Sequence, residues 1–256
     1  MSRNVLITGG SSGIGAELVR AFAAAGHAVW FTYNRGEERA RALAASLPGG
    51  DVRSFHLDLG DWESQQRLIE ALPGPVEMLI NNAGLGTKTV EQYASESHRQ
   101  DEALLQVNAV GTLWLTQALV DDMRRGGFGK IVFISSVGGG MTQFPGFRLA
   151  DGMSKAAVAH LGRQLAAEMA HEPIDVFTVC PGATDTPMFR QSSVDHLSDD
   201  QRQRLLAQLP GARMIEPEEI AELVLFLCTP AARVLRGAVL DASLGLGVHP
   251  GLITGR

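Results

Sequence analysis

The chain is poor in the residue types that would define several classes of protein. It has two cysteines among 256 residues, and both lie in apolar runs, so they are expected to be buried thiols of a reducing compartment rather than a disulfide framework. No cluster of lysine or arginine stands out, and the net charge of -6 argues against a nucleic-acid or polyanion surface. The histidines lack metal-ligand spacing, so no metal site is expected.

Long apolar runs and tyrosines are also scarce. No stretch approaches the ~20 consecutive apolar residues of a membrane span, and the N-terminus shows no basic, apolar and small-residue signal pattern. We therefore expect a cytoplasmic protein without a membrane partner. The only tyrosines are Tyr33 and Tyr93, so the second half of the chain has no phenol to offer as an acid or base.

What the sequence does contain is an alternation of strand-like and helix-like segments. Short β-branched or aliphatic runs predict strands at 5–7, 28–32, 52–57, 76–80, 130–134, 174–180 and 238–240. Amphipathic segments predict helices at 14–25, 37–47, 62–72, 101–124, 155–170 and 217–228. This order indicates an α/β fold with a parallel sheet covered on both faces. Because no linker or repeat interrupts it, residues 1–256 are predicted to form a single domain.

One polar segment, residues 187–210, breaks this alternation. It lies between a predicted strand and the last predicted helix and contains the polar runs 191–193 and 199–202. The segment fits either a solvated loop with a helix or a mobile lid over a substrate. The lid is favoured because the segment follows the carboxyl end of a strand.

A glycine-rich turn, Thr8 to Gly15, follows the first predicted strand and opens the first helix. Its glycines let the backbone turn tightly and approach a pyrophosphate, whose charge is met by amides at a helix N-terminus. The strand–turn–helix context makes this signal stronger than an isolated glycine motif. Other polar motifs end later strands: Asn81-Asn82-Ala83-Gly84, Ser135-Ser136 and Pro181 to Thr186. Open α/β sheets bind their ligands at such strand ends.

In this order, these motifs closely resemble those of the short-chain dehydrogenase/reductase family over essentially the whole chain. The resemblance implies a Rossmann-type, doubly wound parallel sheet of about seven strands in three layers. It also implies a nicotinamide dinucleotide, a small-molecule substrate and a homotetramer or homodimer assembled through the long helices. The residues expected at the cofactor are Gly9, Ser11, Ser12, Gly13, Ile14, Gly15, Asn34, Arg35, Asp58, Leu59, Asn82, Ala83, Gly84, Lys155, Pro181, Gly182, Thr184 and Thr186.

The resemblance further implies a catalytic group in which a tyrosine precedes the lysine by four residues. Asn108, Ser136 and Lys155 match three members of that group, but the tyrosine position holds Asp151. The choice of Ser136 over Ser135 rests on the spacing to the lysine, which is a residue or two longer here than is usual.

Asp151 changes the chemistry that is expected of the site. Aspartic acid has an ordinary pKa of ~3.9 against ~10 for tyrosine, so it is a poor proton donor at pH 7. Its i,i+4 spacing to Lys155 lets the two side chains meet as an ion pair. Three classes of function remain open, besides an engineered change of tyrosine to aspartate or a rearranged site. The favoured one is hydride transfer, either to an iminium carbon, which needs no proton donor, or to a carbonyl whose proton comes from water, Ser136 or the substrate. The others are a non-redox isomerase, dehydratase or cyclase with Asp151 as base, and nucleotide binding without catalysis.

The end of the second predicted strand bears on the choice of nucleotide. A carboxylate there would bind the ribose 2′-hydroxyl and indicate NAD. The strand instead runs into Asn34 and Arg35, which places an arginine for a 2′-phosphate. Glu37 and Glu38 follow on the next helix and can compete for the same position. The sequence therefore favours NADP(H) over NAD(H).

Overall fold

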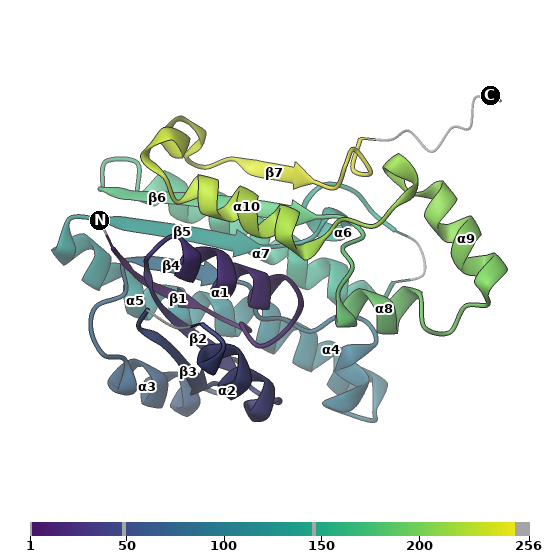
Figure 1. Ribbon diagram of the computed structural model, residues 1–256, viewed down its shortest axis with the longest axis horizontal. Helices are drawn as coiled ribbons and strands as arrows, with labels where there is room; N and C mark the ends of the chain where they lie inside the picture. The colour runs from purple at the N-terminus through teal and green to yellow at the C-terminus, as the bar shows by residue number, and fades with distance from the viewer. Residues whose placement is uncertain (1, 48–49, 145–146, 249–256) are drawn as a thin grey trace.

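The computed structural model describes residues 2–47, 50–144 and 147–248, and its centre is a seven-stranded parallel sheet (Figure 1). The strand order is β3-β2-β1-β4-β5-β6-β7, with every neighbouring pair parallel. The strands are β1 Asn4–Ile7, β2 Ala28–Tyr33, β3 Val52–His56, β4 Met78–Asn81, β5 Gly129–Ile134, β6 Ile174–Pro181 and β7 Val239–Ala242. The predicted Rossmann-type α/β fold is confirmed.

Helices cover both faces of the sheet. They are α1 Gly13–Ala24, α2 Glu37–Ala45, α3 Trp62–Ala71, α4 Ser97–Leu105, α5 Thr112–Gly126, α6 Val137–Gly140, α7 Leu149–Glu168, α8 Pro187–Ser193, α9 Asp199–Gln208 and α10 Pro217–Leu227. Short 3-10 helices occupy Thr89–Gln92, Pro210–Ala212 and Pro230–Leu235, and a π-helix occupies Gln106–Gly111.

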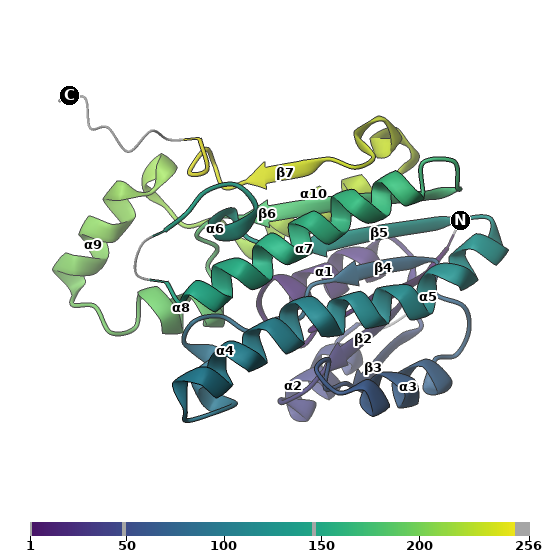
Figure 2. The same cartoon turned by 180° about the vertical axis from the view of Figure 1, so that it is seen from behind.

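Two hydrophobic cores lie on opposite faces of the sheet. Leu104, Leu115 and Leu165 bring α4, α5 and α7 onto one face, which Figure 2 shows in front. Leu18 and Val224 bring α1 and α10 onto the other face, which is in front in Figure 1. Because the sheet is covered twice, most of its strands are buried along their length, which explains why they appear in the sequence as continuous apolar runs.

The predicted helix 101–124 is longer in the structure and is interrupted by the π-helix. Close packing explains the interruption: a Cβ built on Gly111 would lie 2.1 Å from the carbonyl oxygen of Leu59. The Gly111 carbonyl also accepts a hydrogen bond from Gln65 Nε2 at 3.0 Å. Such π-helical turns often occur at functional sites, and this one contains Asn108.

Residues 97–126 correct the expectation that no stretch of the chain is long and apolar enough to span a membrane. By length and composition this helical stretch is apolar enough to cross a membrane, with a mean hydropathy of 1.3 in a window that is 50% buried. Leu104, Leu115 and Leu119 of the same stretch are part of the core against the sheet. In this fold the stretch is therefore a core element.

Two further segments differ from their predicted extents. Helix α7 begins at Leu149, six residues before the predicted start, and Asp151 lies in its first turn, where a carboxylate interacts favourably with the helix dipole. The polar segment 187–210 folds into α8 and α9, two short helices that bury none of their residues. Both elements border the carboxyl edge of the sheet (Figures 1 and 2).

Candidate active site

A cavity of about 980 Å³ opens at the carboxyl ends of the strands. It lies where the strand order reverses between β1 and β4, which is the usual ligand crevice of such sheets. All the predicted cofactor residues except Asp58 line it, and so do Ser136 and Asp151. Asn108 is not in the cavity wall but lies directly behind it, packed against Gly84 and Leu85.

The glycine-rich turn forms one end of the cavity. Gly13 adopts a φ of +53°, a left-handed conformation that side-chain-bearing residues rarely adopt. A Cβ built on Gly15 would lie 2.1 Å from the carbonyl oxygen of Gly9. Only glycine therefore fits at this turn, which leaves the first amides of α1 open to an anion.

Hydrogen bonds join this turn to the Asn81–Gly84 motif. Asn82 Nδ2 donates to the carbonyl oxygens of Thr8 and Gly9 at 3.0 and 3.2 Å. In return, Thr8 Oγ1 accepts from the backbone amides of Asn82 and Ala83 at 3.0 and 2.9 Å. The two motifs predicted to bind one ligand thus form a single wall of the cavity.

Asp58 is the predicted cofactor residue that does not line the cavity. Its Oδ1 accepts from the backbone amide of Gly60 at 3.0 Å, which holds the carboxylate within its own turn. Leu57 and Leu59 on either side of it do line the cavity.

The end of β2 forms a second, polar end of the cavity. Asn34 Nδ2 donates to the hydroxyl of Tyr93 at 2.7 Å, and the Arg35 guanidinium lies 4.8 Å from the centre of the Tyr93 ring. Arg35 also donates to the carbonyl oxygen of Gln92 at 3.1 Å. Burial raises the pKa of Tyr93, and the charge of Asp58 adds to this effect. The contacts with Asn34 and Arg35 hold the Tyr93 side chain at this end of the cavity.

Ser136 and Ser135 follow β5 and take different roles. Ser136 caps α6, and its Oγ accepts from the amide of Gly138 at 3.1 Å, so its own proton is available for another partner. Ser135 is buried, and its hydroxyl donates to the carbonyl oxygen of Lys155 at 2.8 Å. Both serines line the cavity, Ser136 with a hydroxyl proton free for another partner and Ser135 as a support for α7.

Asn108 supports the same region from the π-helix. Its Oδ1 accepts from the amide of Leu85 at 2.7 Å, and its Nδ2 donates to the Leu85 carbonyl and to Ser154 Oγ, both at 2.9 Å. Asn108 is 1% exposed, and these contacts join the loop after β4 to helix α7. Its side chain holds together the elements that carry Gly84 and Lys155.

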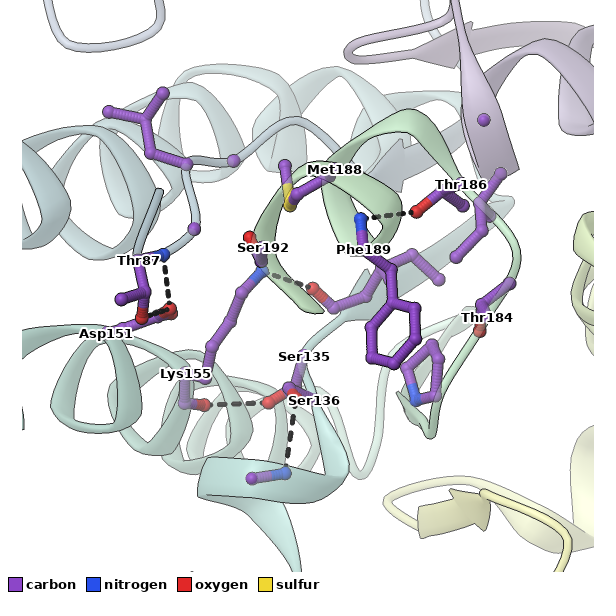
Figure 3. A pocket seen from close by; sticks show the side chains of 18 of the residues that line it. Thr87, Ser135, Ser136, Asp151, Lys155, Thr184, Thr186, Met188, Phe189 and Ser192 are labelled. Carbon is purple, nitrogen blue, oxygen red and sulfur yellow. Dashed lines mark hydrogen bonds between the residues drawn. The ribbon is translucent and has the colours of Figure 1, made fainter. Parts of the chain in front are cut away.

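Lys155 extends into the cavity between the Thr87–Asp151 pair and Ser136 (Figure 3). Its Nζ donates to the carbonyl oxygen of Ile134 at 3.3 Å. A Cβ built on Gly84 would lie 3.2 Å from that Nζ, so a larger residue would crowd the ammonium. Burial lowers the pKa of Lys155, and the negative charge of Asp151 acts in the opposite direction.

Asp151 does not form the ion pair with Lys155 that its spacing predicted. No nitrogen–oxygen pair within 4 Å joins these two described side chains. Instead, Asp151 Oδ2 accepts from the backbone amide and the hydroxyl of Thr87 at 2.8 and 2.7 Å (Figure 3). The reason is geometric: the loop after β4 presents two donors to the first turn of α7, closer than the lysine one turn further on. We call this pair of contacts the Thr87–Asp151 latch.

Several wall residues have no signal in the sequence. Thr87 and Tyr93 lie in the loop after β4, and their partners are 64 and 59 residues away in the chain. Apolar side chains from the segment before α7 and from α8 form the outer wall: Phe144, Phe147, Met188 and Phe189. Among the residues described, no group of three or more His, Cys, Asp or Glu side chains is placed to hold a metal ion.

A Rossmann-type sheet with a glycine cradle, and with serine and lysine at the strand ends, is the arrangement of a dinucleotide-binding protein. Comparison with known proteins gives the family. A family model described as short chain dehydrogenase matches residues 3–196. The chain belongs to the short-chain dehydrogenase family and is an oxidoreductase of the kind that uses a nicotinamide cofactor.

Relatives of known name cover nearly the whole chain. An acetoacetyl-CoA reductase of Rhizobium meliloti is 33% identical over 248 residues, which cover 96% of this chain and 98% of the relative. A 3-oxoacyl-[acyl-carrier-protein] reductase of Mycobacterium tuberculosis is 31% identical over 251 residues, covering 97% and 94%. A crystal structure of an actinorhodin polyketide ketoreductase with NADPH aligns with a TM-score of 0.86 at 30% identity, covering 97% of this chain and 98% of that one.

Proposed function

We propose that this protein is an NADP(H)-dependent reductase that transfers hydride to a C=O or C=N group of a small molecule. The observation that carries the proposal is the single cavity that runs from the glycine turn and Arg35 at one end to Ser136, Asp151 and Lys155 at the other. A dinucleotide spans such a crevice, so its reactive ring would lie at the end where the serine and lysine are.

The residues present fit a dinucleotide. The glycine cradle has no room for a Cβ at Gly15, and it exposes the amides of α1 to a pyrophosphate. Pro181, Gly182, Thr184 and Thr186 would hold the carboxamide, and Lys155 would hold the adjacent ribose. When bound, the reduced nicotinamide supplies the hydride.

The preference for NADP(H) rests on the end of the cavity near β2. Arg35 lies there over Tyr93, and Asn34 is held by the same tyrosine. No carboxylate among the described residues lines this end of the cavity. A guanidinium in a stretch of wall that no described carboxylate lines favours a 2′-phosphate over a free 2′-hydroxyl.

The atypical feature of the site is Asp151, in the position where the family has tyrosine. The Ser136 hydroxyl keeps its proton free and would donate it as a hydrogen bond to the substrate oxygen. Asp151 is held by Thr87 and acts on Lys155 through its charge, which opposes the lowering of the lysine pKa by burial. We therefore assign Asp151 a positioning role and not that of proton donor.

The outer wall suggests what the substrate carries besides its reacting group. Phe144 and Phe147 lie before α7, and Met188 and Phe189 lie in α8. Phe147 is 45% exposed and Met188 is 39% exposed, so these large apolar side chains face the opening. A substrate with an apolar substituent would bury them, and the relatives named as acyl reductases point in the same direction.

Residues 187–210 are proposed to be a lid on this substrate. Helices α8 and α9 bury none of their own residues, so they have little to hold them against the rest of the chain. A Cβ built on Gly86 would lie 3.2 Å from Met188 Sδ, which places α8 directly over the loop after β4. Closure of this segment would exclude water from Ser136 and Lys155.

We propose a single domain that assembles as a homotetramer or homodimer through α4, α5 and α7. The aromatic pair of the exposed Trp62 and the half-buried Trp114, with ring centres 5.6 Å apart, supports a partner on the α5 surface. Trp62 is 47% exposed, and large exposed aromatic side chains are enriched at protein interfaces. Sedimentation velocity tests this: a species of at least two chains is expected, and a Trp114→Glu variant should be smaller.

The experiment that tests the function measures NADPH consumption over a panel of apolar ketones, 3-oxoacyl thioesters and cyclic iminium salts. We expect turnover with at least one class, and a loss of about 100-fold or more in Ser136→Ala for carbonyl substrates. Asp151→Tyr should increase the reduction of simple ketones. Product formation without net NADPH consumption, abolished in Asp151→Asn, would instead support the non-redox reaction. Tight nucleotide binding without turnover would support a binding protein.

A further inference from the structure

The cavity wall contains few groups that can supply a proton to a substrate. Among the described lining residues, the titratable side chains are Tyr33, Arg35, Tyr93, Arg148, Asp151 and Lys155. The first three lie at the β2 end, where Asn34 and Arg35 contact Tyr93. Arg148, Asp151 and Lys155 are the ones that lie near Ser136.

Neither Arg148 nor Asp151 suits the role of acid. The Arg148 guanidinium donates to Asp101 Oδ1 at 2.7 Å and to Ser97 Oγ at 3.1 Å, and arginine does not lose its proton in proteins. Asp151 Oδ2 accepts two hydrogen bonds from Thr87, which commits this oxygen to the loop after β4 and not to a substrate. Arg148 and Asp151 therefore hold neighbouring elements of the fold together and are not the source of the proton.

We infer that Lys155 itself donates the proton to the substrate oxygen, in place of the missing tyrosine. An ammonium has three N–H donors, and within the described residues one of them is taken, by the carbonyl oxygen of Ile134 at 3.3 Å. Gly84 leaves room for Nζ at the cavity wall. The inference rests on the proposed reductase function and adds the identity of its acid.

The acid strength of lysine suits this role. Its ordinary pKa of ~10.4 is close to the ~10 of tyrosine, so the ammonium is about as strong an acid as the phenol it replaces. Burial lowers the pKa of Lys155 further, while the charges of Asp151 on the same helix and Cys180 on β6 raise it. Its hydrogen-bond partner, the backbone of Ile134, is uncharged.

The proton and electron balance of the step is complete. The carbonyl carbon accepts hydride from the reduced nicotinamide, the C=O π electrons move to oxygen, and that oxygen takes a proton from Lys155 Nζ. The products are the alcohol, the oxidised cofactor and a neutral amine on Lys155, which regains its proton from water. An iminium carbon accepts hydride in the same way but yields a neutral amine, so its reduction needs no proton.

This difference gives a sharp test with Lys155→Arg, which keeps the positive charge but cannot donate its proton. We expect Lys155→Arg to lose about 100-fold or more in the reduction of a ketone, the range of general acid catalysis. Reduction of an N-alkylated cyclic iminium salt should fall by less than about tenfold, because it uses only the charge and position of the side chain. Lys88→Arg, on an exposed lysine paired with Glu91, is the matched control and should change neither rate.

Several results would overturn the inference. Equal losses for both substrates would mean that Lys155 only holds the cofactor, and retained ketone reduction would mean that the proton comes from elsewhere. A wild-type enzyme that reduces the iminium salt but no carbonyl would also refute Lys155 as donor, while leaving the reductase function intact. If neither substrate is reduced, it is the proposed function that fails.

A second readout does not depend on activity. The chain has only three lysines, Lys88, Lys130 and Lys155, so carbon-13 labelling at the lysine ε position gives three resonances that single substitutions assign. In the complex with NADP+, the pKa of Lys155 should lie below its ordinary value, and lower still in Asp151→Asn, because the opposing charge is removed. A Lys155 that is already neutral at the pH of the assay contradicts the inference, because it then has no proton to donate.

Discussion

Replacing Asp151 with alanine removes both hydrogen bonds of the Thr87–Asp151 latch. A hydrogen bond to a charged group contributes ~1.5–3 kcal/mol when it is well buried. Asp151 is only partly buried, and water screens such a charge, so we expect Asp151→Ala to lower the free energy of unfolding by about 1–2 kcal/mol in total. Asp151→Asn keeps an oxygen that can accept from both Thr87 donors, so it should lower the free energy of unfolding by less than about 0.5 kcal/mol.

Urea unfolding at a fixed chain concentration measures both variants, since a stability that depends on assembly also depends on concentration. A double-mutant cycle with Thr87→Val, which removes the hydroxyl but keeps the amide, should show a coupling free energy of about 0.5–1 kcal/mol between the two positions. Additive effects of the two substitutions would refute the latch. So would an Asp151→Asn variant as unstable as Asp151→Ala.

Further predictions concern parts of the chain away from the latch. Burial alone would raise the pKa of Asp175, but hydrogen bonds from Lys130 and Arg236 outweigh it and hold the pKa below its ordinary 3.8. The stabilisation is therefore present above pH 3.8 and lost as the pH falls below it. Asp175→Asn should lower the free energy of unfolding by about 3–5 kcal/mol at neutral pH, measured by thermal or urea unfolding. The further loss of stability on going to acid pH should be smaller in this variant than in the wild type. Arg35→Glu should raise the affinity for NADH relative to NADPH by about tenfold or more in calorimetry, and an unchanged ratio would contradict the NADP(H) preference. Gly15→Ala would place a Cβ 2.1 Å from a backbone oxygen of the turn, so the melting shift produced by NADPH should disappear.

Local patterns in the sequence predicted most of the sheet and of the glycine-rich wall of the cavity. A parallel strand buried on both faces is a continuous apolar run, and this run is visible without knowing its neighbours. The cradle around Gly13 and Gly15 is equally local, because backbone conformation and close packing at one turn demand glycine. Each of these features depends on residues that are close together in the chain.

The contacts that give the site its character are not local. Asp151 was expected to pair with Lys155 because the two are one helical turn apart, yet its partner Thr87 lies 64 residues earlier. The position of Asn108 depends on a π-helix that forms where Gly111 packs against Leu59. The spacing of apolar residues in the sequence does not predict this close approach. These features follow from the way the loops after β4 and β5 meet helix α7 in three dimensions.

The most direct test of the account follows a deuterium label. The purified protein is given an apolar ketone and NADPH deuterated at the transferring position of the nicotinamide ring. Mass spectrometry and NMR then locate the label. The account predicts one deuterium on the carbon that becomes the alcohol carbon, with one NADPH consumed for each product formed. An unlabelled product, or one formed without consumption of NADPH, would contradict hydride transfer as the function of this site.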